Sequence, residues 1–310
     1  MNRFAKFAWG VVAWNMFTIL WGAFVRASGS GAGCGSHWPN CNGEIIPSPE
    51  NVKTVIEFTH RALSGVALLL VLALLIWAWR RYPKGSPVRF GAGGSALFII
   101  IEAALGAGLV LLRLVEDNDS VLRAVMIALH LLNTFILLAF LVLTGWWASG
   151  GKALSLKDKG HLPLLFGIGL VGIALIGMSG AITALGDTLF PAQSLAHGLE
   201  QDADPDAHFL IRLRVYHPII AILFGVYTLS LVSYLRGKIK NLPTRRLALA
   251  LRWLIIAQLA AGVTNLLLLA PIAMQIVHLL LADLVWITYV LLAASSLSIE
   301  NDQNISEEVA

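Results

Sequence analysis

The chain has 310 residues, of which 57% are hydrophobic and only 13% are charged. Soluble domains carry about 25% charged residues, so this composition excludes an ordinary soluble protein and indicates an integral membrane protein. The formal net charge of +4 does not indicate nucleic-acid binding, because the basic residues lie in short loops between apolar runs and form no single patch. Two cysteines, Cys34 and Cys41, are too few for a disulfide-stapled scaffold but allow one bridge.

Apolar runs of about 20 residues, the length needed to cross a bilayer, recur along the whole chain. We predict eight transmembrane helices, over residues 7–26, 55–79, 90–113, 121–147, 163–185, 210–235, 246–270 and 272–296. The first run follows Arg3 and Lys6, as in a signal peptide. It is longer than the roughly 7–15 apolar residues of such a peptide and lacks a convincing cleavage site, so we expect a retained helix. The last two helices are separated only by a tight turn at Pro271.

The distribution of lysine and arginine predicts the orientation in the membrane. One side collects 15 of the 22 basic residues, including Lys238 and Lys240. The other side holds fewer basic residues and an acidic loop, Glu200 to Asp206. We therefore expect a multi-pass protein of the plasma membrane, with both termini cytoplasmic and the Cys34–Cys41 loop external. The acidic tail from Glu300 to Glu308 does not change this, because acidic residues contribute little to the rule.

A weak internal repeat relates the two halves of the chain. The string around His130 in the fourth run resembles that around His278 in the eighth. Glu102 precedes Leu105-Gly106-Ala107-Gly108, much as Gln258 precedes Ala261-Gly262. We predict an all-α fold of two pseudo-symmetric four-helix bundles, one in residues 1–150 and one in residues 151–310 with a short cytoplasmic tail.

Four histidines lie within the predicted helices, all on even-numbered ones and near their outer ends: His60, His130, His217 and His278. Polar side chains in lipid are costly and normally face the bundle interior or a cavity. Two such helices in each half would bring a pair of imidazoles to opposite faces of one flat, apolar cofactor. Histidine is a common axial ligand of haem, so the pattern favours haem binding.

Other interpretations of these histidines carry less weight. A single intramembrane histidine often only forms an interhelical hydrogen bond, but four at matched positions favour a shared ligand. A zinc site is disfavoured because no cysteine or carboxylate cluster stands at zinc spacing on these helices. Covalent c-type haem is excluded because the sequence has no Cys-x-x-Cys-His motif.

Charged residues accompany the histidines. Glu57 lies three residues before His60 on the same helix face, where a carboxylate could accept protons, although helix starts also favour glutamate for their dipole. Four arginines at the outer ends are candidate partners for haem propionates, and snorkelling to the interface explains each of them equally well. They are Arg26, Arg61, Arg212 and Arg214. Glu102 and Asp283 lie deeper and are interpreted as polar contacts without an assigned role.

Cys34 and Cys41 lie in a glycine-rich loop on the oxidising side of the membrane. A short-loop structural disulfide is the expected state. A redox-active pair is the alternative, and the sequence does not decide between them.

Several long strings resemble the haem A synthase family, and the resemblance extends from the first to the last predicted helix. In the first half these are Val25-Arg26-Ala27-Ser28-Gly29-Ser30-Gly31, Trp38-Pro39-Asn40-Cys41-Asn42-Gly43 and Glu57-Phe58-Thr59-His60-Arg61. In the second half they are the run from Gly180 to Ala192 and the run from His208 to Pro218. Relatives of the type with this cysteine pair sometimes carry a second pair, which the 186–209 loop lacks.

The resemblance implies a membrane oxidoreductase that converts haem O to haem A by oxidising a ring methyl to a formyl group, for terminal oxidase assembly. It further implies that His60 and His130 ligate the substrate haem and that Glu57 is the catalytic carboxylate. His217 and His278 would ligate a resident haem b. Haem O synthase is the implied partner, and a quinone or another electron acceptor is needed.

Two functions compete with this interpretation. A dihaem b-type electron-transfer cytochrome without a haem product would share the topology and the four histidines, but Glu57 and the family strings argue against it. A transporter would predict discontinuous helices and a midplane site, whereas these histidines lie near the outer face. The sequence leaves open the oxygen source, the electron acceptor and the oligomeric state, a homo-oligomer included.

Overall fold

The computed structural model describes residues 1–237 and 241–298, and all regular secondary structure in that part is α-helical. The helices are α1 Arg3–Ala27, α2 Val52–Arg81, α3 Pro87–Leu111, α4 Val121–Ala148, α5 Leu162–Leu189, α6 Leu195–Ala203, α7 Phe209–Arg214, α8 Tyr216–Arg236, α9 Leu242–Leu267 and α10 Ile272–Ser296. Lys238, Lys240 and the acidic tail from Glu300 to Glu308 lie outside the described residues.

The eight predicted spans are confirmed as helices that are long and apolar enough to cross a membrane. The sixth span combines α7 and α8, which meet at Val215. The tight turn before α10 is present, with Leu269 and Ala270 both at positive φ. All-α architecture and a multi-pass membrane class are therefore established for the described part of the chain.

The segment 186–209, predicted as a loop, needs a correction. Helix α5 continues to Leu189, and α6 occupies Leu195–Ala203. A nine-residue helix cannot cross a bilayer, so a search for apolar runs of about 20 residues passes over it. Its start does carry a local signal, because the Ser194 hydroxyl accepts a hydrogen bond from the backbone of His197.

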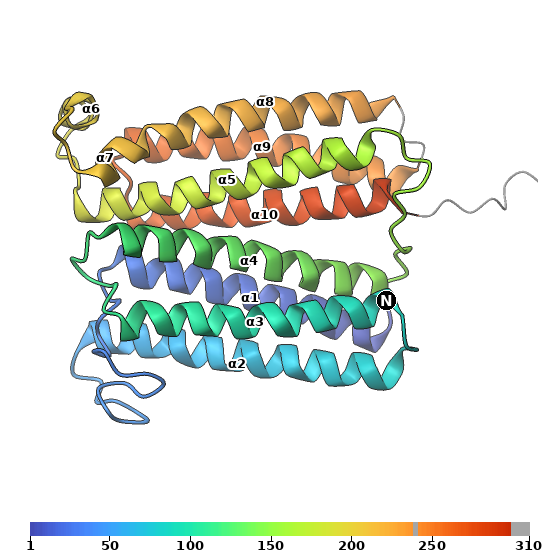
Figure 1. The fold of residues 1–310 in the computed structure, drawn as a ribbon, viewed down its shortest axis with the longest axis horizontal. Coiled ribbons are helices and arrows are strands. Elements are labelled where there is room, and N and C mark those ends of the chain that lie inside the picture. The colour runs from blue at the N-terminus through green and yellow to red at the C-terminus, as the bar shows by residue number, and fades with distance from the viewer. Residues whose placement is uncertain (238–240, 299–310) are drawn as a thin grey trace, which may run out of the picture.

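Figure 1 shows α1 to α4 lying together on one side and α5, α8, α9 and α10 together on the other. The two groups meet where α4 packs against α5 and α10, and where α1 packs against α10. The N-terminus and the end of α10 lie at one end of the bundle, whereas α6 and the loop between α1 and α2 lie at the opposite end. The pseudo-symmetry and the boundary near residue 150 stay predictions.

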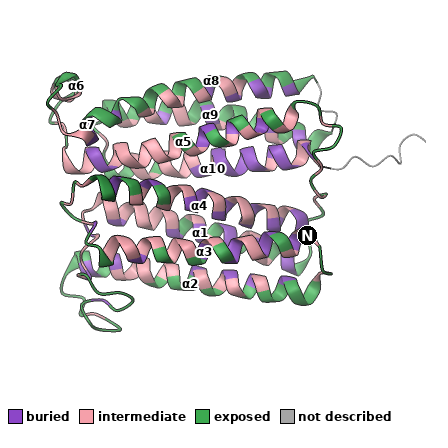
Figure 2. Ribbon diagram, viewed as in Figure 1, coloured by how far each residue is buried: buried purple, intermediate pink, exposed green. Residues whose placement is uncertain are grey.

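Burial is distributed as expected for a protein surrounded by lipid (Figure 2). Large apolar side chains on the spans are exposed, among them Leu69 at 66% and Leu223 at 63%. Polar side chains of the same spans are buried, among them Asn15, Ser95 and Asp283. The core is still largely apolar, but the outer faces are apolar as well, because lipid replaces water around them.

Candidate functional site

The four intramembrane histidines occupy matched places in the fold. Each lies within about the first three turns of its span, near the end that carries the loop between α1 and α2. Each also faces a glycine of the preceding span. The pairs are Gly22 with His60, Gly106 with His130, Gly180 with His217, and Gly262 with His278.

The glycines leave space that the imidazoles occupy. A Cβ added at Gly22 would lie 2.8 Å from Cε1 of His60, and one at Gly180 would lie 2.9 Å from Cε1 of His217. The corresponding distance from Gly262 to His278 is 3.2 Å. A Cβ added at Gly106 would lie 3.8 Å from Cε1 of His130, which is an ordinary van der Waals distance. Three of the four rings therefore pack so closely on the neighbouring helix that a methyl group would displace them.

The structure brings two of the histidines close together. The ring centres of His217 and His278 are 6.4 Å apart, and the ring planes are nearly perpendicular at 88°. His60 on α2 and His130 on α4 belong to the other group of helices. The roles of the two pairs as haem ligands stay predictions.

This arrangement fits a haem held between two imidazoles. With metal–imidazole bonds of about 2 Å, the ring centres of two axial ligands stand about 6 Å apart, close to the separation of His217 and His278. The buried Nδ1 atoms of His60 and His278 have no hydrogen-bond partner. Nδ1 of His130 makes no hydrogen bond either but lies 3.5 Å from Oε1 of Glu102, and Nδ1 of His217 lies 3.2 Å from the Ser179 hydroxyl. Among the described residues no cluster of three or more His, Cys, Asp or Glu side chains could hold a free metal ion.

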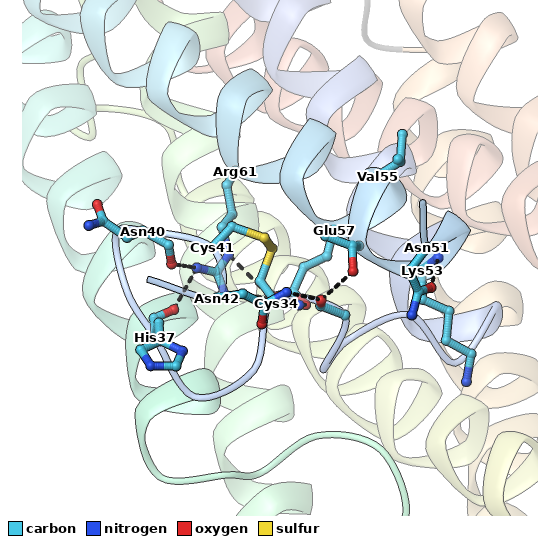
Figure 3. The surroundings of a disulfide bond; sticks show 12 residues. Cys34, His37, Asn40, Cys41, Asn42, Asn51, Lys53, Val55, Glu57 and Arg61 are labelled. Carbon is cyan, nitrogen blue, oxygen red and sulfur yellow. Dashed lines mark hydrogen bonds and ion pairs between the residues drawn. A yellow bond between two sulfur atoms is a disulfide. The ribbon is translucent and has the colours of Figure 1, made fainter. Parts of the chain in front are cut away.

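Glu57 lies at the base of the loop between α1 and α2 and is almost fully buried (Figure 3). Its Oε2 accepts a 2.8 Å hydrogen bond from the backbone N–H of Cys34. Its Oε1 accepts two hydrogen bonds from Arg61, at 2.6 Å from Nη2 and 3.1 Å from Nε. The carboxylate one turn before His60 is thus held in one orientation by a backbone donor and a guanidinium.

The cysteine loop is attached to α2 through the same arginine. Nη1 of Arg61 donates to the carbonyls of His37, at 2.6 Å, and Asn40, at 2.7 Å. The expected disulfide between Cys34 and Cys41 is present and closes this loop. Arg61 therefore joins the Glu57 carboxylate to two carbonyls between the bridged cysteines, and the dashed lines in Figure 3 mark its bonds to them.

The other three arginines also bind protein groups. Arg26 donates to the carbonyl of Ala184 at 2.7 Å, to Thr188 at 2.8 Å and to Gln275 at 2.8 Å, and so links α1 to α5 and α10. Arg214 pairs with Asp202 at 2.5 Å and lies 3.6 Å from Asp187. Arg212 makes one 3.3 Å bond to the carbonyl of Pro205. A role for any of them at haem propionates stays a prediction.

Sequence reasoning missed the residues that surround the ligands. The glycines facing the histidines and Ser179 beside His217 were not predicted to contact them. A signal was present, because Gly106 and Gly262 recur in the internal repeat. Which face each glycine presents depends on the packing of two helices, which the repeat alone does not reveal.

Comparison with known proteins identifies the family. Residues 5–290 match the family model described as cytochrome oxidase assembly protein, COX15-CtaA. The chain belongs to this family. The COX15-CtaA match covers all eight spans, in agreement with the resemblance that the sequence strings indicated.

Curated relatives agree with the COX15-CtaA assignment. The heme A synthase of Staphylococcus aureus strain JH9 is 30% identical over 245 residues, which are 76% of each chain. The heme A synthase of Exiguobacterium sibiricum is 29% identical over 266 residues, 84% of this chain and 85% of the relative. A Thermus thermophilus protein named protoheme IX farnesyltransferase is 53% identical over 297 residues. That match covers 96% of this chain but 49% of the relative, so the chain spans about half of its length.

Proposed function

We propose that this chain is a haem A synthase, a membrane oxidoreductase that converts a ring methyl of haem O to a formyl group. The observation that carries the proposal is the adjacent pair His217 and His278, combined with the anchored Glu57 one turn before His60. Membership of the COX15-CtaA family and the relatives named heme A synthase support it. A dihaem electron-transfer cytochrome would need the histidines but not a buried carboxylate held beside one of them.

The two histidine pairs have different roles in this proposal. His60 and His130 hold the iron of the substrate haem O in the half formed by residues 1–150. His217 and His278 hold a resident haem b in the half formed by residues 151–310, where the Ser179 hydroxyl orients the His217 ring. When bound, haem b supplies one-electron redox chemistry for the oxidation.

Glu57 acts as the general base. The methyl carbon is oxidised first to a hydroxymethyl group and then to a gem-diol, which loses water to give the formyl group. Each of the two oxidations adds the oxygen of one water molecule and releases two electrons and two protons, and the electrons leave to an external acceptor of the quinone class. Each oxidation releases protons, and a carboxylate held at one place can accept them. Arg61 and the Cys34 N–H fix the direction in which the two Glu57 oxygens point. Loop closure by the disulfide keeps the Cys34 donor in place.

The partner that we propose is the enzyme that makes haem O. The Thermus thermophilus relative is named protoheme IX farnesyltransferase, and about half of its length lies outside the matched region. A farnesylated haem is too apolar to cross water freely, so delivery between neighbouring membrane enzymes is physically favourable. We place both termini in the cytoplasm and the cysteine loop outside, because that loop and the N-terminus lie at opposite ends of the bundle and the N-terminal end carries most of the basic residues.

The test is to extract haem from membranes of a haem-O-producing host with and without this chain. We expect a new formyl-haem only when the chain is present. Replacing Glu57 with Ala should leave haem b bound and lower the haem A yield about 100-fold or more, the usual loss for a general base. The exposed loop residue Glu50 provides a matched control, and Glu50→Ala should keep the wild-type yield.

Two results would contradict the proposal. Unchanged haem O beside a haem-loaded protein would favour the electron-transfer cytochrome. A full haem A yield from Glu57→Ala would show that this residue only binds Arg61 and the Cys34 N–H at the start of α2 and takes no part in the reaction.

A further inference from the structure

Glu102 and Gln258 occupy equivalent places in the two halves of the fold. Gly106 on α3 faces His130, and Gly262 on α9 faces His278. Counting back four residues, one helical turn, gives Glu102 on α3 and Gln258 on α9. One histidine of each pair therefore has a neighbour of the same size one turn before its glycine, acidic in the first half and neutral in the second. The two neighbours lie by different ring nitrogens, Nδ1 of His130 and Nε2 of His278.

Glu102 is held against His130 by α4. Its Oε1 lies 3.5 Å from Nδ1 of His130. Its Oε2 accepts a 2.6 Å hydrogen bond from the Asn133 amide, and its Oε1 accepts a hydrogen bond from the Thr134 hydroxyl. Asn133 and Thr134 follow His130 by about one turn, so the residues that hold the carboxylate belong to the helix that carries the ligand. The position of Glu102 relative to the ring is therefore fixed.

The second half lacks this clamp. The Nε2 atom of Gln258 lies 3.4 Å from Nε2 of His278, and the Gln258 Oε1 has no hydrogen-bond partner. The positions that correspond to Asn133 and Thr134 are Leu281 and Ala282, whose side chains cannot donate hydrogen bonds. The neighbour of His278 is thus both uncharged and loosely held.

We propose that Glu102 is a positioning residue that tunes the iron held by His60 and His130. A histidine that ligates iron through Nε2 carries its proton on Nδ1, the atom that faces the Glu102 carboxylate. A carboxylate at that place fixes the ring and raises the basicity of the ligand. A more basic ligand stabilises ferric over ferrous iron, so the reduction potential of this haem is lowered. The inference rests on the proposed function, since it assumes a haem between His60 and His130.

The test compares a reciprocal pair of variants, Glu102→Gln and Gln258→Glu. Haem b serves as the probe and is added to the purified full-length protein until both halves are loaded. Spectra recorded during a redox titration give one midpoint potential for each haem, and His130→Ala and His278→Ala assign the two signals. Haem content, measured in parallel, separates tuning from loss of binding.

We expect Glu102→Gln to raise the potential of the haem in the first half and to leave the other unchanged. A tenfold change in the ferric-to-ferrous ratio corresponds to about 59 mV for one electron, and we expect a shift of at least that size. Gln258 lies by Nε2 of His278 and not by Nδ1, so Gln258→Glu serves as a control that should leave the potential of the haem in the first half unchanged. Unchanged potentials, equal shifts in both halves, or loss of haem from Glu102→Gln without a shift would each overturn the inference.

The same experiment separates this inference from the proposed function. A wild-type protein that binds no haem in either half would overturn both. Two bound haems whose midpoint potentials are the same in Glu102→Gln as in the wild type would overturn only the role of Glu102.

Discussion

At the residue scale, the histidines and Glu57 stand out in the sequence as candidate site residues, because ionisable side chains within apolar runs are conspicuous. Their roles stay predictions, and the side chains around them could not be predicted. Glu102 was interpreted as a polar contact without a role, and the structure places it beside His130 through Asn133 and Thr134. Such a contact depends on how α3 and α4 are rotated about their axes, and no local pattern specifies that rotation.

Gly180 provides a test of ligand positioning at this scale. We expect Gly180→Ala to displace the His217 ring, because the new Cβ would lie 2.9 Å from its Cε1. Forcing a side chain off its rotamer costs about 1 kcal/mol, which corresponds to a roughly fivefold weaker binding of haem b. Titration of the apoprotein with haem b measures this change.

The matched control for Gly180 is Gly167 on the same helix, where an added Cβ meets nothing within 4 Å. Gly167→Ala should bind haem b as the wild type does. Equal affinity of both variants would show that the Gly180 contact does not position His217.

At the element scale, the spans were predictable because membrane crossing requires about 20 consecutive apolar residues. Helix α6 was not, because its nine residues carry no such run. The attachment of the cysteine loop to α2 was also missed. Arg61 was predicted as a candidate partner for haem propionates, which stays a prediction. That its side chain binds Glu57 and the carbonyls of His37 and Asn40 was not predicted.

Removing Arg61 should loosen the cysteine loop and Glu57 together. In Arg61→Ala, two loop carbonyls and one Glu57 oxygen lose their charged donor. We expect the loop to become more sensitive to limited proteolysis and the haem A yield to fall about tenfold or more, because general-base catalysis depends on geometry. Haem b content should not change, since Arg61 lies on the helix of His60.

Lys53 on the same helix is the control for Arg61, because it is an exposed basic residue at the start of α2. Lys53→Ala should keep both the yield and the protease resistance. If Arg61→Ala behaves in the same way, the loop and the carboxylate are held by other contacts.

At the scale of the whole molecule, the repeat predicted two halves but not how they join. The halves are joined by contacts between residues far apart in the sequence. Trp286 on α10 donates a buried 2.7 Å hydrogen bond to the carbonyl of Phe135 on α4, and the two rings stack at 4.9 Å. At the end of the bundle that carries the cysteine loop, Arg26 binds α5 and α10. Neither contact leaves a periodic signal, so the sequence could not reveal it.

Arg26 should therefore contribute to the stability of the assembled bundle. Its guanidinium makes three hydrogen bonds to α5 and α10, and a hydrogen bond to a charged group contributes about 1.5–3 kcal/mol. We expect Arg26→Ala to unfold several degrees below the wild type in detergent. Arg212→Ala, which removes a single 3.3 Å bond, should unfold at the wild-type temperature. A normal melting temperature with reduced haem content would instead favour propionate binding by Arg26.

The most direct test of the central claim is the haem content and spectrum of the four single histidine-to-alanine variants, each purified from a haem-O-producing host. His217→Ala and His278→Ala should both lose the bis-imidazole spectrum of the resident haem, because the centres of the two rings lie 6.4 Å apart. His60→Ala and His130→Ala should retain that spectrum and lose the other haem. An unaltered spectrum in His278→Ala, or a haem lost jointly by His60→Ala and His278→Ala, would contradict the pairing within each half.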